Sequence, residues 1–234
     1  MKISGSIVAL FICMGCLDCL HGQGTFQNLD FESAMLSSVP PGEFGGYVSI
    51  STALPGWTGY LGGVQTTLVL QNDYTLGAPS INVLGPQWNE NPGIIDGNYS
   101  VYLQPGDNAT IASIAQSGTI PDGTKTLLFD ASQLPDATPF SVTFAGDSLS
   151  LVLLFTSQSP SGQPYDVYGA NVSSFAGQTG QLEFTVYPKS YNSLLLDDIS
   201  FSSITVTPEP DPLALMGVGA ALLAAYRRLM ENRK

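Results

Sequence analysis

Between Thr25 and Thr207 the chain contains no cysteine, no histidine and no arginine. Without these residues the segment has no thiol nucleophile, cannot form a Ser-His-Asp triad and cannot bind zinc through histidine. The chemistry that remains is that of carboxylates, hydroxyls and lysine. We therefore expect a protein that is not an enzyme.

Positive charge is also scarce in this segment. It has two lysines, Lys125 and Lys189, against 15 acidic residues, a net charge of −13. Nucleic-acid binding is excluded as a function, since phosphate contacts need clustered Lys and Arg. A surface of this kind tolerates cations or neutral polymers as partners. Only 11% of all residues are charged, so the chain owes its polarity to Ser, Thr, Asn, Gln and Gly.

The start of the chain has the pattern of a secretory signal. Lys2 precedes an apolar run from Ile7 to Leu20 that is broken only by small residues and Asp18, and Gly22 to Gly24 supply small residues for cleavage. The run is shorter than the ~20 apolar residues that a membrane span needs. We predict a signal peptide over residues 1–24 and export through the Sec translocon.

All three cysteines of the chain, Cys13, Cys16 and Cys19, lie within this signal. Their spacing is superficially that of metal ligands, but the only histidine, His21, would be removed together with them. Gly15-Cys16 is a weak alternative as a lipid acceptor, since the residues before it fit that pattern poorly. No metal site is expected from these cysteines.

The end of the chain combines three features. Pro208-Glu209-Pro210 comes first, an uncharged apolar segment follows from Leu213 to Tyr226, and the pair Arg227-Arg228 comes next. Fourteen residues of helix span about 21 Å, short of the ~30 Å hydrocarbon core unless the flanking residues contribute. The basic flank is expected on the cytoplasmic side of a membrane.

This order of features resembles the PEP-CTERM sorting tail of Gram-negative bacteria. The resemblance covers residues 207–234 and implies recognition of Pro208, Glu209, Pro210, Arg227 and Arg228 by an exosortase-type membrane enzyme. It also implies an inner-membrane anchor before sorting, and then a place at the cell surface or in extracellular polysaccharide or biofilm material. The alternative is an ordinary single-pass anchor with an accidental Pro-Glu-Pro.

Residues 25–206 show the pattern of a single β-domain. Short alternating runs are bounded by Gly, Pro, Asn and Asp, and no helical period persists. The clear strand predictions are Ser80–Leu84, Tyr99–Gln104, Ala109–Gln116, Thr126–Ala131, Phe140–Ala145, Leu149–Phe155, Gln181–Val186 and Leu194–Phe201, with Asn28–Glu32 and Gln65–Gln71 weaker. About ten strands in one domain predict an all-β antiparallel sandwich.

Two details of these strands are predicted. Alternation in Gln181–Val186 puts Leu182, Phe184 and Val186 on one face. Gly146-Asp147 suits a tight hairpin, because glycine tolerates the positive φ of such a turn. We expect this hairpin to pair Phe140–Ala145 with Leu149–Phe155.

Segments at the two ends of the domain resemble the first and last strands of galactose-binding-like jelly rolls, a fold shared by several carbohydrate-binding modules. They are Asn28-Leu29-Asp30-Phe31-Glu32 with Pro55-Gly56-Trp57, and Leu196-Asp197-Asp198-Ile199-Ser200-Phe201. Gly97 to Leu103 and Tyr168 to Phe175 fit the middle of the fold. The resemblance implies a jelly-roll body flanked by the signal helix and the tail helix.

In that family an acidic residue of the first strand often joins one of the last strand around a structural calcium. The matching positions are Glu32, Asp197 and Asp198. Calcium prefers six to eight hard oxygen ligands, which carboxylates and carbonyls can supply. The alternative is that these acids simply face solvent. No other cofactor is expected.

Sugar binding needs an exposed aromatic ring beside hydrogen-bonding groups. Trp88 is the best candidate, because the segment from Gly85 to Pro92 is rich in turn formers and amides. Tyr165 and Tyr168, placed in a loop region after Gly162, are secondary candidates. Trp57 resembles a core tryptophan of the family instead.

Three functions follow from these patterns. The first is an exported, sorted β-sandwich that binds exopolysaccharide or resides in the extracellular matrix without catalysis. The second is a purely structural surface protein with no specific ligand. The third is a glycoside hydrolase, which would need two carboxylates with separated pKa values in one cleft.

Overall fold

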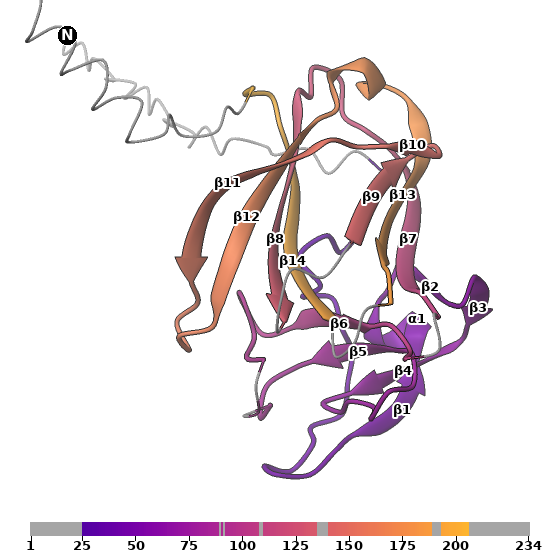
Figure 1. Ribbon diagram of the computed structural model, residues 1–234, viewed down its shortest axis with the longest axis vertical. Helices are drawn as coiled ribbons and strands as arrows, with labels where there is room; N and C mark the ends of the chain where they lie inside the picture. Colours follow the sequence, from indigo (N-terminus) through magenta and orange to yellow (C-terminus); the bar gives the residue numbers. More distant parts are fainter. Residues whose placement is uncertain are drawn as a thin grey trace, which may run out of the picture.

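The computed structural model describes residues 25–88, 90, 92–107, 110–134, 140–188 and 193–205, without the side chains of Gln133 and Leu134. These residues form two facing β-sheets, with a short helix α1 (Ile50–Ala53) and a 3₁₀ turn η1 (Ser173–Phe175) (Figure 1). The predicted signal (1–24) and sorting tail (207–234) lie outside the described residues. Within the described part of the chain, no helix is long and apolar enough to cross a membrane.

The larger sheet has eight strands. Their order is β1 (Gly46–Ser49), β4 (Leu68–Gln71), β5 (Ser80–Leu84), β6 (Ser100–Gln104), β14 (Ser193–Ser202), β8 (Thr126–Leu134), β12 (Pro164–Asn171) and β11 (Leu151–Gln158). All neighbours are antiparallel except β4 and β5, which are parallel. In Figure 1 the strands β1, β4, β5 and β6 run across the lower end, and the others run upright.

The smaller sheet has six antiparallel strands. Their order is β10 (Asp147–Ser148), β9 (Phe140–Phe144), β13 (Thr179–Val186), β7 (Ala112–Thr119), β2 (Thr58–Leu61) and β3 (Val64–Thr66). The two sheets enclose one main apolar core, which confirms the predicted β-sandwich.

Alternation along the strands supplies this core. Leu182, Phe184 and Val186 of β13 are all at most 1% exposed, as predicted. The Phe184 ring meets Phe129 of β8 edge to face at 5.2 Å, which joins the two sheets. The buried apolar residues of this core run from Phe26 to Phe201, so the described part of the chain carries its own core.

The predicted strand Asn28–Glu32 is wrong, because this segment forms a turn. Asn28 and Phe31 have φ of 51° and 58°, a left-handed conformation that Asn tolerates and that breaks the extended course of a regular strand. The Asn28 side chain accepts a hydrogen bond from the Ser33 amide at 2.8 Å. The segments at the two ends of the β-domain lie side by side, since the Ile199 amide of β14 donates to the Leu29 carbonyl at 3.0 Å.

The hairpin at Gly146 is only partly as predicted. Ala145 and Gly146 have positive φ, and β9 turns back into the two-residue strand β10. The expected pairing of β9 with Leu149–Phe155 is wrong. The Leu149 amide donates a hydrogen bond to the Val142 carbonyl of β9. Beyond this residue the chain crosses to the eight-stranded sheet, where β11 pairs with β12.

The eight clear strand predictions each overlap an observed strand, with ends shifted by up to three residues. The predicted Gln65–Gln71 is two strands, β3 and β4, which belong to different sheets. Four strands, β1, β2, β10 and β12, were not expected. They are short or contain Gly, Pro, Asp or Asn, which lowers the strand signal.

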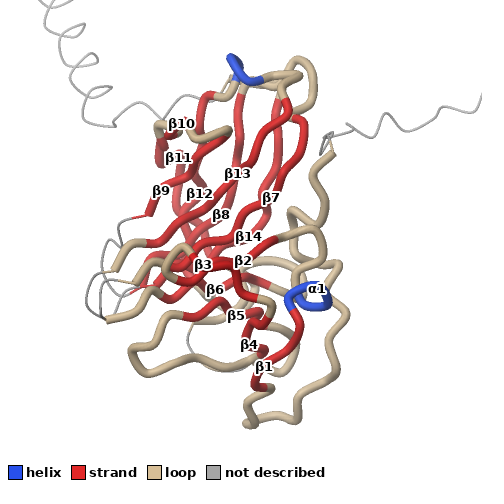
Figure 2. Tube along the Cα trace, turned by 90° about the vertical axis from the view of Figure 1, so that its right-hand side faces the viewer, coloured by secondary structure: helices blue, strands red, loops and turns tan. Residues whose placement is uncertain are grey.

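A second, smaller apolar group lies on the outer face of the eight-stranded sheet. Leu84, Ile95 and Leu195 are buried there, against partly buried Ile94 and Tyr102. Ile95 belongs to the loop between β5 and β6, so this loop covers part of the outer face. Long loops collect at this lower end of the molecule, around β1, β4 and β5 (Figure 2).

Candidate functional site: an exposed aromatic cluster

Trp88 lies in the loop between β5 and β6. Its ring is half-buried and packs against the outer-face group around Leu84 and Ile95. Its Nε1 donates to the carbonyl of Pro92 at 2.6 Å. Because the indole N–H is already bonded within the same loop, Trp88 can offer a ligand its ring surface but not its donor.

Two further rings, unexpected from the sequence, contact Trp88. Phe44 is 57% exposed and Tyr74 is 42% exposed. The centroid of Trp88 lies 6.0 Å from that of Tyr74 and 6.4 Å from that of Phe44, and Phe44 and Tyr74 are 5.7 Å apart. These distances are those of favourable ring pairs. Phe44, Tyr74 and Trp88 are called the ring cluster below.

The loop that carries Phe44 is fixed by Gln71, the last residue of β4. The Gln71 carbonyl accepts a hydrogen bond from the Gly45 amide at 3.0 Å, and its side-chain Nε2 donates to the Ser37 carbonyl at 2.6 Å. A Cβ on Gly45 would lie 2.7 Å from the Gln71 carbonyl oxygen, so only glycine permits this approach. Phe44 is therefore held beside the end of β4.

The next residue, Asn72, fixes the loop that carries Trp88. It is 2% exposed and has φ of 44°. Its Oδ1 accepts from the Gly85 amide at 2.7 Å, and its Nδ2 donates to the Pro86 carbonyl at 3.2 Å. Tyr74 follows two residues later. The end of β4 thus positions all three rings.

A pocket of about 530 Å³ opens beside Trp88. Its lining includes Glu90, Ile94 and Ser161. Buried Gln163 fixes one wall, because its Oε1 accepts from the Gly93 amide at 2.9 Å. The volume lies in the range of ligand sites.

A second pocket, of about 360 Å³, opens beside Tyr74 and includes Asp107 and Tyr102 in its lining. The Gln104 side chain ties the Tyr74 loop to β6, since its Nε2 donates to the Thr75 carbonyl at 2.6 Å and its Oε1 accepts from the Thr75 amide at 3.3 Å. Burial raises the pKa of Tyr102, whose phenol also shares a hydrogen bond with Ser193. The pocket therefore joins an aromatic wall to hydrogen-bonding groups.

Acidic side chains surround the ring cluster. Glu90 and Asp107 line the two pockets, and Glu43 and Asp73 precede Phe44 and Tyr74 in the sequence. Among the described residues Lys125 is the one cation, and it does not line either pocket. Among the described residues, the site thus offers negatively charged hydrogen-bond acceptors and no cation that could pair with an anion.

The two secondary candidates, Tyr165 and Tyr168, were expected in a loop. Both lie in strand β12 instead. Tyr165 packs against the outer-face group, as Trp88 does. Tyr168 contacts the main core, where its ring stacks on Phe129 at 5.5 Å. The structure therefore places Tyr165 and Trp88 against the same apolar group and Tyr168 on the other side of the sheet.

Glu32, the first of the three predicted calcium ligands, is bonded to a neighbouring loop. Its Oε1 accepts from the amides of Asn98 and Tyr99 at 2.7 and 2.9 Å, and its Oε2 accepts from the Asn98 side chain at 2.9 Å. A Cβ on Gly97 would meet the same carboxylate at 2.3 Å. The Glu32 carboxylate thus accepts three N–H hydrogen bonds from this loop.

Asp197 and Asp198 differ in burial, because β14 is irregular between Asp197 and Ser200. Asp197 is 1% exposed, and Asp198 is exposed with φ of 43°. Asp197 Oδ2 accepts from the Ser100 hydroxyl at 2.6 Å and the Asp96 amide at 3.2 Å.

The residues predicted to bind calcium do not fit a shared cation as they stand. The groups bonded to Glu32 and Asp197 are N–H and O–H donors, whereas calcium needs oxygen acceptors around it. Within the described residues there is no group of three or more His, Cys, Asp or Glu side chains that could hold a metal ion. A calcium titration is the test of that prediction.

Asp197 has a second acidic neighbour that the sequence pattern did not indicate. Asp130 of β8 is its register partner across the strands and is also buried. Burial raises the pKa of Asp197 to about 8 and that of Asp130 to about 7, and the charge of Asp198 adds to both shifts. Near neutral pH this pair holds protons that an exposed pair would release.

Two-carboxylate hydrolysis needs both acids in one cleft, some 5 to 9.5 Å apart. The pocket beside Trp88 has one acid in its lining, Glu90, and the pocket beside Tyr74 has one, Asp107. A third pocket of about 460 Å³, beside Phe44, has none. Asp130 and Asp197 line none of these three pockets.

Comparison with known proteins gives no family by sequence. No family model and no curated protein matches the chain.

Solved structures give distant matches. They include the carbohydrate-binding module TmCBM61 in complex with β-1,4-galactotriose, at 12% identity and a TM-score of 0.37 over 77% of this chain and 99% of the other. The enzymatically active domain of tailspike protein 4 of bacteriophage CBA120 has 14% identity and a TM-score of 0.36 over 63% of this chain and 19% of the other. The K2 cleaved adhesin domain of Lys-gingipain has 16% identity and a TM-score of 0.35 over 74% and 96%.

Of the three predicted ligand-binding residues, Trp88 belongs to the ring cluster and Tyr165 and Tyr168 do not. Its two partners, Phe44 and Tyr74, were not predicted. The signal that could have indicated these two rings is the one used for Trp88, an aromatic residue among turn formers. Phe44 follows Pro41-Gly42-Glu43, and Tyr74 follows Asn72-Asp73. The predicted sorting residues, Pro208 to Pro210 with Arg227 and Arg228, lie outside the described residues.

Proposed function

We propose that this chain is an exported β-sandwich protein that binds polysaccharide without cleaving it, through the ring cluster of Phe44, Tyr74 and Trp88. One observation carries the proposal: three rings in mutual contact, two exposed and one half-buried, lie on the outside of the sandwich, whereas the other ring contacts belong to the main core. Contiguous exposed apolar groups on a soluble domain mark interaction sites.

The chemistry of the surroundings favours a sugar as the ligand. A pyranose has an apolar face, which stacks on a ring, and hydroxyls, which need acceptors and donors. Pockets containing Glu90, Asp107 and the Tyr102 phenol flank the rings. A purely apolar partner would offer no hydrogen-bond donor to the exposed carboxylates of Glu90 and Asp107.

The location of the protein is part of the proposal and rests on the sequence. The signal over residues 1–24 takes the chain through the Sec translocon, and an exosortase-type enzyme recognises the tail at Pro208-Glu209-Pro210. A cell-surface or matrix location brings the ring cluster into contact with exopolysaccharide. Replacing the three residues by alanine in a host with an exosortase should retain the protein at the inner membrane, and unchanged release would contradict the sorting step.

The binding step is tested on a fragment of residues 25–207, which carries the whole described core. A glycan array and exopolysaccharide pull-downs, with and without calcium, should show selective binding that Trp88→Ala reduces at least about tenfold, since stacking on a ring contributes about 1–3 kcal/mol per base in the analogous nucleotide case. A thermal melt of each variant separates lost binding from lost fold. If the folded fragment binds no polysaccharide, the protein is a structural surface protein and the proposal is wrong.

A further inference from the structure

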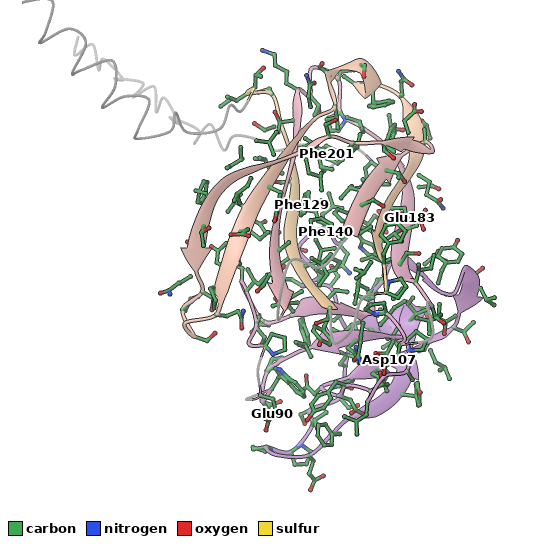
Figure 3. All side chains as sticks on the ribbon, in the orientation of Figure 1. Glu90, Asp107, Phe129, Phe140, Glu183 and Phe201 are labelled. Carbon is green, nitrogen blue, oxygen red and sulfur yellow. The ribbon has the colours of Figure 1, made fainter. Side chains whose placement is uncertain are left out.

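Of the three pockets beside the ring cluster, the two that contain an acidic residue lie on different sides of it. Tyr74 lines the pocket that contains Asp107, and Trp88 lines the pocket that contains Glu90. The two rings meet edge to face at 6.0 Å. Figure 3 shows Asp107 and Glu90 on opposite sides of the lower end of the molecule. One surface therefore runs from pocket to pocket across the rings.

Both pockets have walls held by buried or bonded amides. Gln104 bonds to Thr75 beside one pocket, and Gln163 bonds to Gly93 beside the other. Gln163 also donates to the Ser132 hydroxyl at 3.1 Å. Ligand pockets with such fixed walls require little ordering on binding, so both pockets can contribute to affinity.

The charges along this surface exclude one class of polysaccharide. Glu90 and Asp107 line its two pockets, and Glu43 and Asp73 directly precede Phe44 and Tyr74 in the sequence. Lys125, the one cation among the described residues, directly precedes β8 and lies outside both pockets. A polymer of uronic acids would bring one carboxylate per sugar against these acids, and no Lys or Arg of the described residues lines either pocket to pair with it. Like charges placed against each other oppose binding.

An uncharged polysaccharide meets no such repulsion. Its hydroxyls can donate to the carboxylates of Glu90 and Asp107, and hydrogen bonds to charged acceptors are stronger than neutral ones. The rings bind its apolar faces between these two contacts. A chain end would fill one pocket only and leave the other side of the ring cluster unused.

We infer that the ring cluster binds the interior of an uncharged polysaccharide chain, which lies across Tyr74 and Trp88 and extends into both pockets. The inference rests on the proposed function and deepens it by naming the class of ligand and the direction of the chain. The recognition elements are the ring cluster, the Glu90 pocket and the Asp107 pocket.

The test compares one polymer in two charge states. The neutral polysaccharide that binds best on the array is oxidised at its C6 hydroxyls, which converts the same backbone into a uronate polymer. Titration calorimetry on the 25–207 fragment, in buffer with EDTA so that calcium cannot bridge carboxylates, should show Kd at least about tenfold weaker for the oxidised form. Oligosaccharides of increasing length should gain affinity until both pockets are filled.

Two isosteric variants, Glu90→Gln and Asp107→Asn, test the two pockets separately. Both side chains are exposed, so the fold should be unaffected, and a melt of each variant checks this. Each variant should reduce the affinity for the long neutral polysaccharide roughly three- to tenfold, because one charged hydrogen-bond acceptor is lost. Glu183→Gln on β13 of the six-stranded sheet is the matched control and should bind as the parent fragment does.

The outcomes are distinct for the two proposals. Equal or tighter binding of the oxidised polymer, or sensitivity to only one of the two pocket variants, would overturn the inference while leaving polysaccharide binding intact. Absence of binding to every polymer would overturn the proposed function, and the inference with it.

Discussion

The two tryptophans have similar sequence surroundings and different environments. Trp57 follows Pro55-Gly56, and Trp88 follows Pro86-Gln87. Trp57 is 4% exposed, donates its Nε1 to the Asn28 carbonyl and meets Phe31 and Phe184 inside the sandwich. Trp88 is half-buried on the outer face. Each indole lies near two other aromatic rings at similar distances. Ring contacts alone therefore do not distinguish a core tryptophan from a surface one, whereas burial does.

The largest difference between the two tryptophans should be in stability. Trp57→Ala leaves a large cavity between the sheets and should lower the free energy of unfolding by about 3–5 kcal/mol. Trp88→Ala removes a half-buried ring and should cost about 1–2 kcal/mol. Urea denaturation of the 25–207 fragment measures both, and equal losses would mean that Trp88 belongs to the core.

Asn72 should link stability to ring position. Asn72→Ala removes two hydrogen bonds from the Trp88 loop and leaves the buried Gly85 amide without its acceptor, which should cost about 1–3 kcal/mol. As a positioning residue it should also weaken polysaccharide binding, although it touches no ligand. Asn72→Asp keeps the acceptor for Gly85 and tolerates the positive φ, so partial rescue of binding is expected. A stable Asn72→Ala fragment with normal binding would contradict this role.

The strands were predictable where apolar and polar residues alternate along the sequence, as in β13 and β5. They were not predictable where the decisive interaction is distant in sequence. Pro164 can begin β12 because proline is tolerated at the first strand position, yet in the sequence it indicates a loop. Asn28–Glu32 alternates well enough to suggest a strand, but the Asn28 side chain bonds to Ser33 and turns the chain.

The site was predictable only in part for the same reason. Trp88 could be recognised from its neighbours, whereas the ring cluster depends on Gln71 and Asn72 bringing three loops together. The pairing of Asp130 with Asp197 depends on the register between β8 and β14, which no local pattern contains.

This acidic pair predicts a stability that falls as the pH rises. Its folded-state pKa values of about 7 and about 8 lie above the ordinary value, so the folded chain binds more protons than the unfolded chain between about pH 4 and pH 8. The stability supplied by the protonated pair is fully present below about pH 4 and is lost as the pH passes through 7 and 8. Denaturation midpoints should decrease over this range.

Asp130→Asn should make that decrease shallower, because an amide does not titrate. Exposed Asp122→Asn is the control and should leave the pH profile as it is in the parent fragment. A stability that is flat or rises from pH 5 to pH 8.5 would show that the pair does not hold its protons in the folded chain.

Calcium should have the smallest effect. The carboxylates of Glu32 and Asp197 are bonded to N–H and O–H donors, so the melting temperature of the fragment should not change between EDTA and millimolar calcium. An increase of several degrees that Glu32→Gln abolishes would restore the calcium site implied by the family resemblance.

Two phenylalanines at opposite edges of the eight-stranded sheet provide the most direct test of the ring cluster. Phe44, before β1, is 57% exposed, and Phe155, in β11, is 52% exposed. Each is replaced by alanine and titrated with the polysaccharide that the parent fragment binds. If the rings bind the polysaccharide, Phe44→Ala should raise Kd roughly three- to tenfold, while Phe155→Ala should leave Kd unchanged. Equal affinities in the two variants would contradict a polysaccharide site at Phe44, Tyr74 and Trp88.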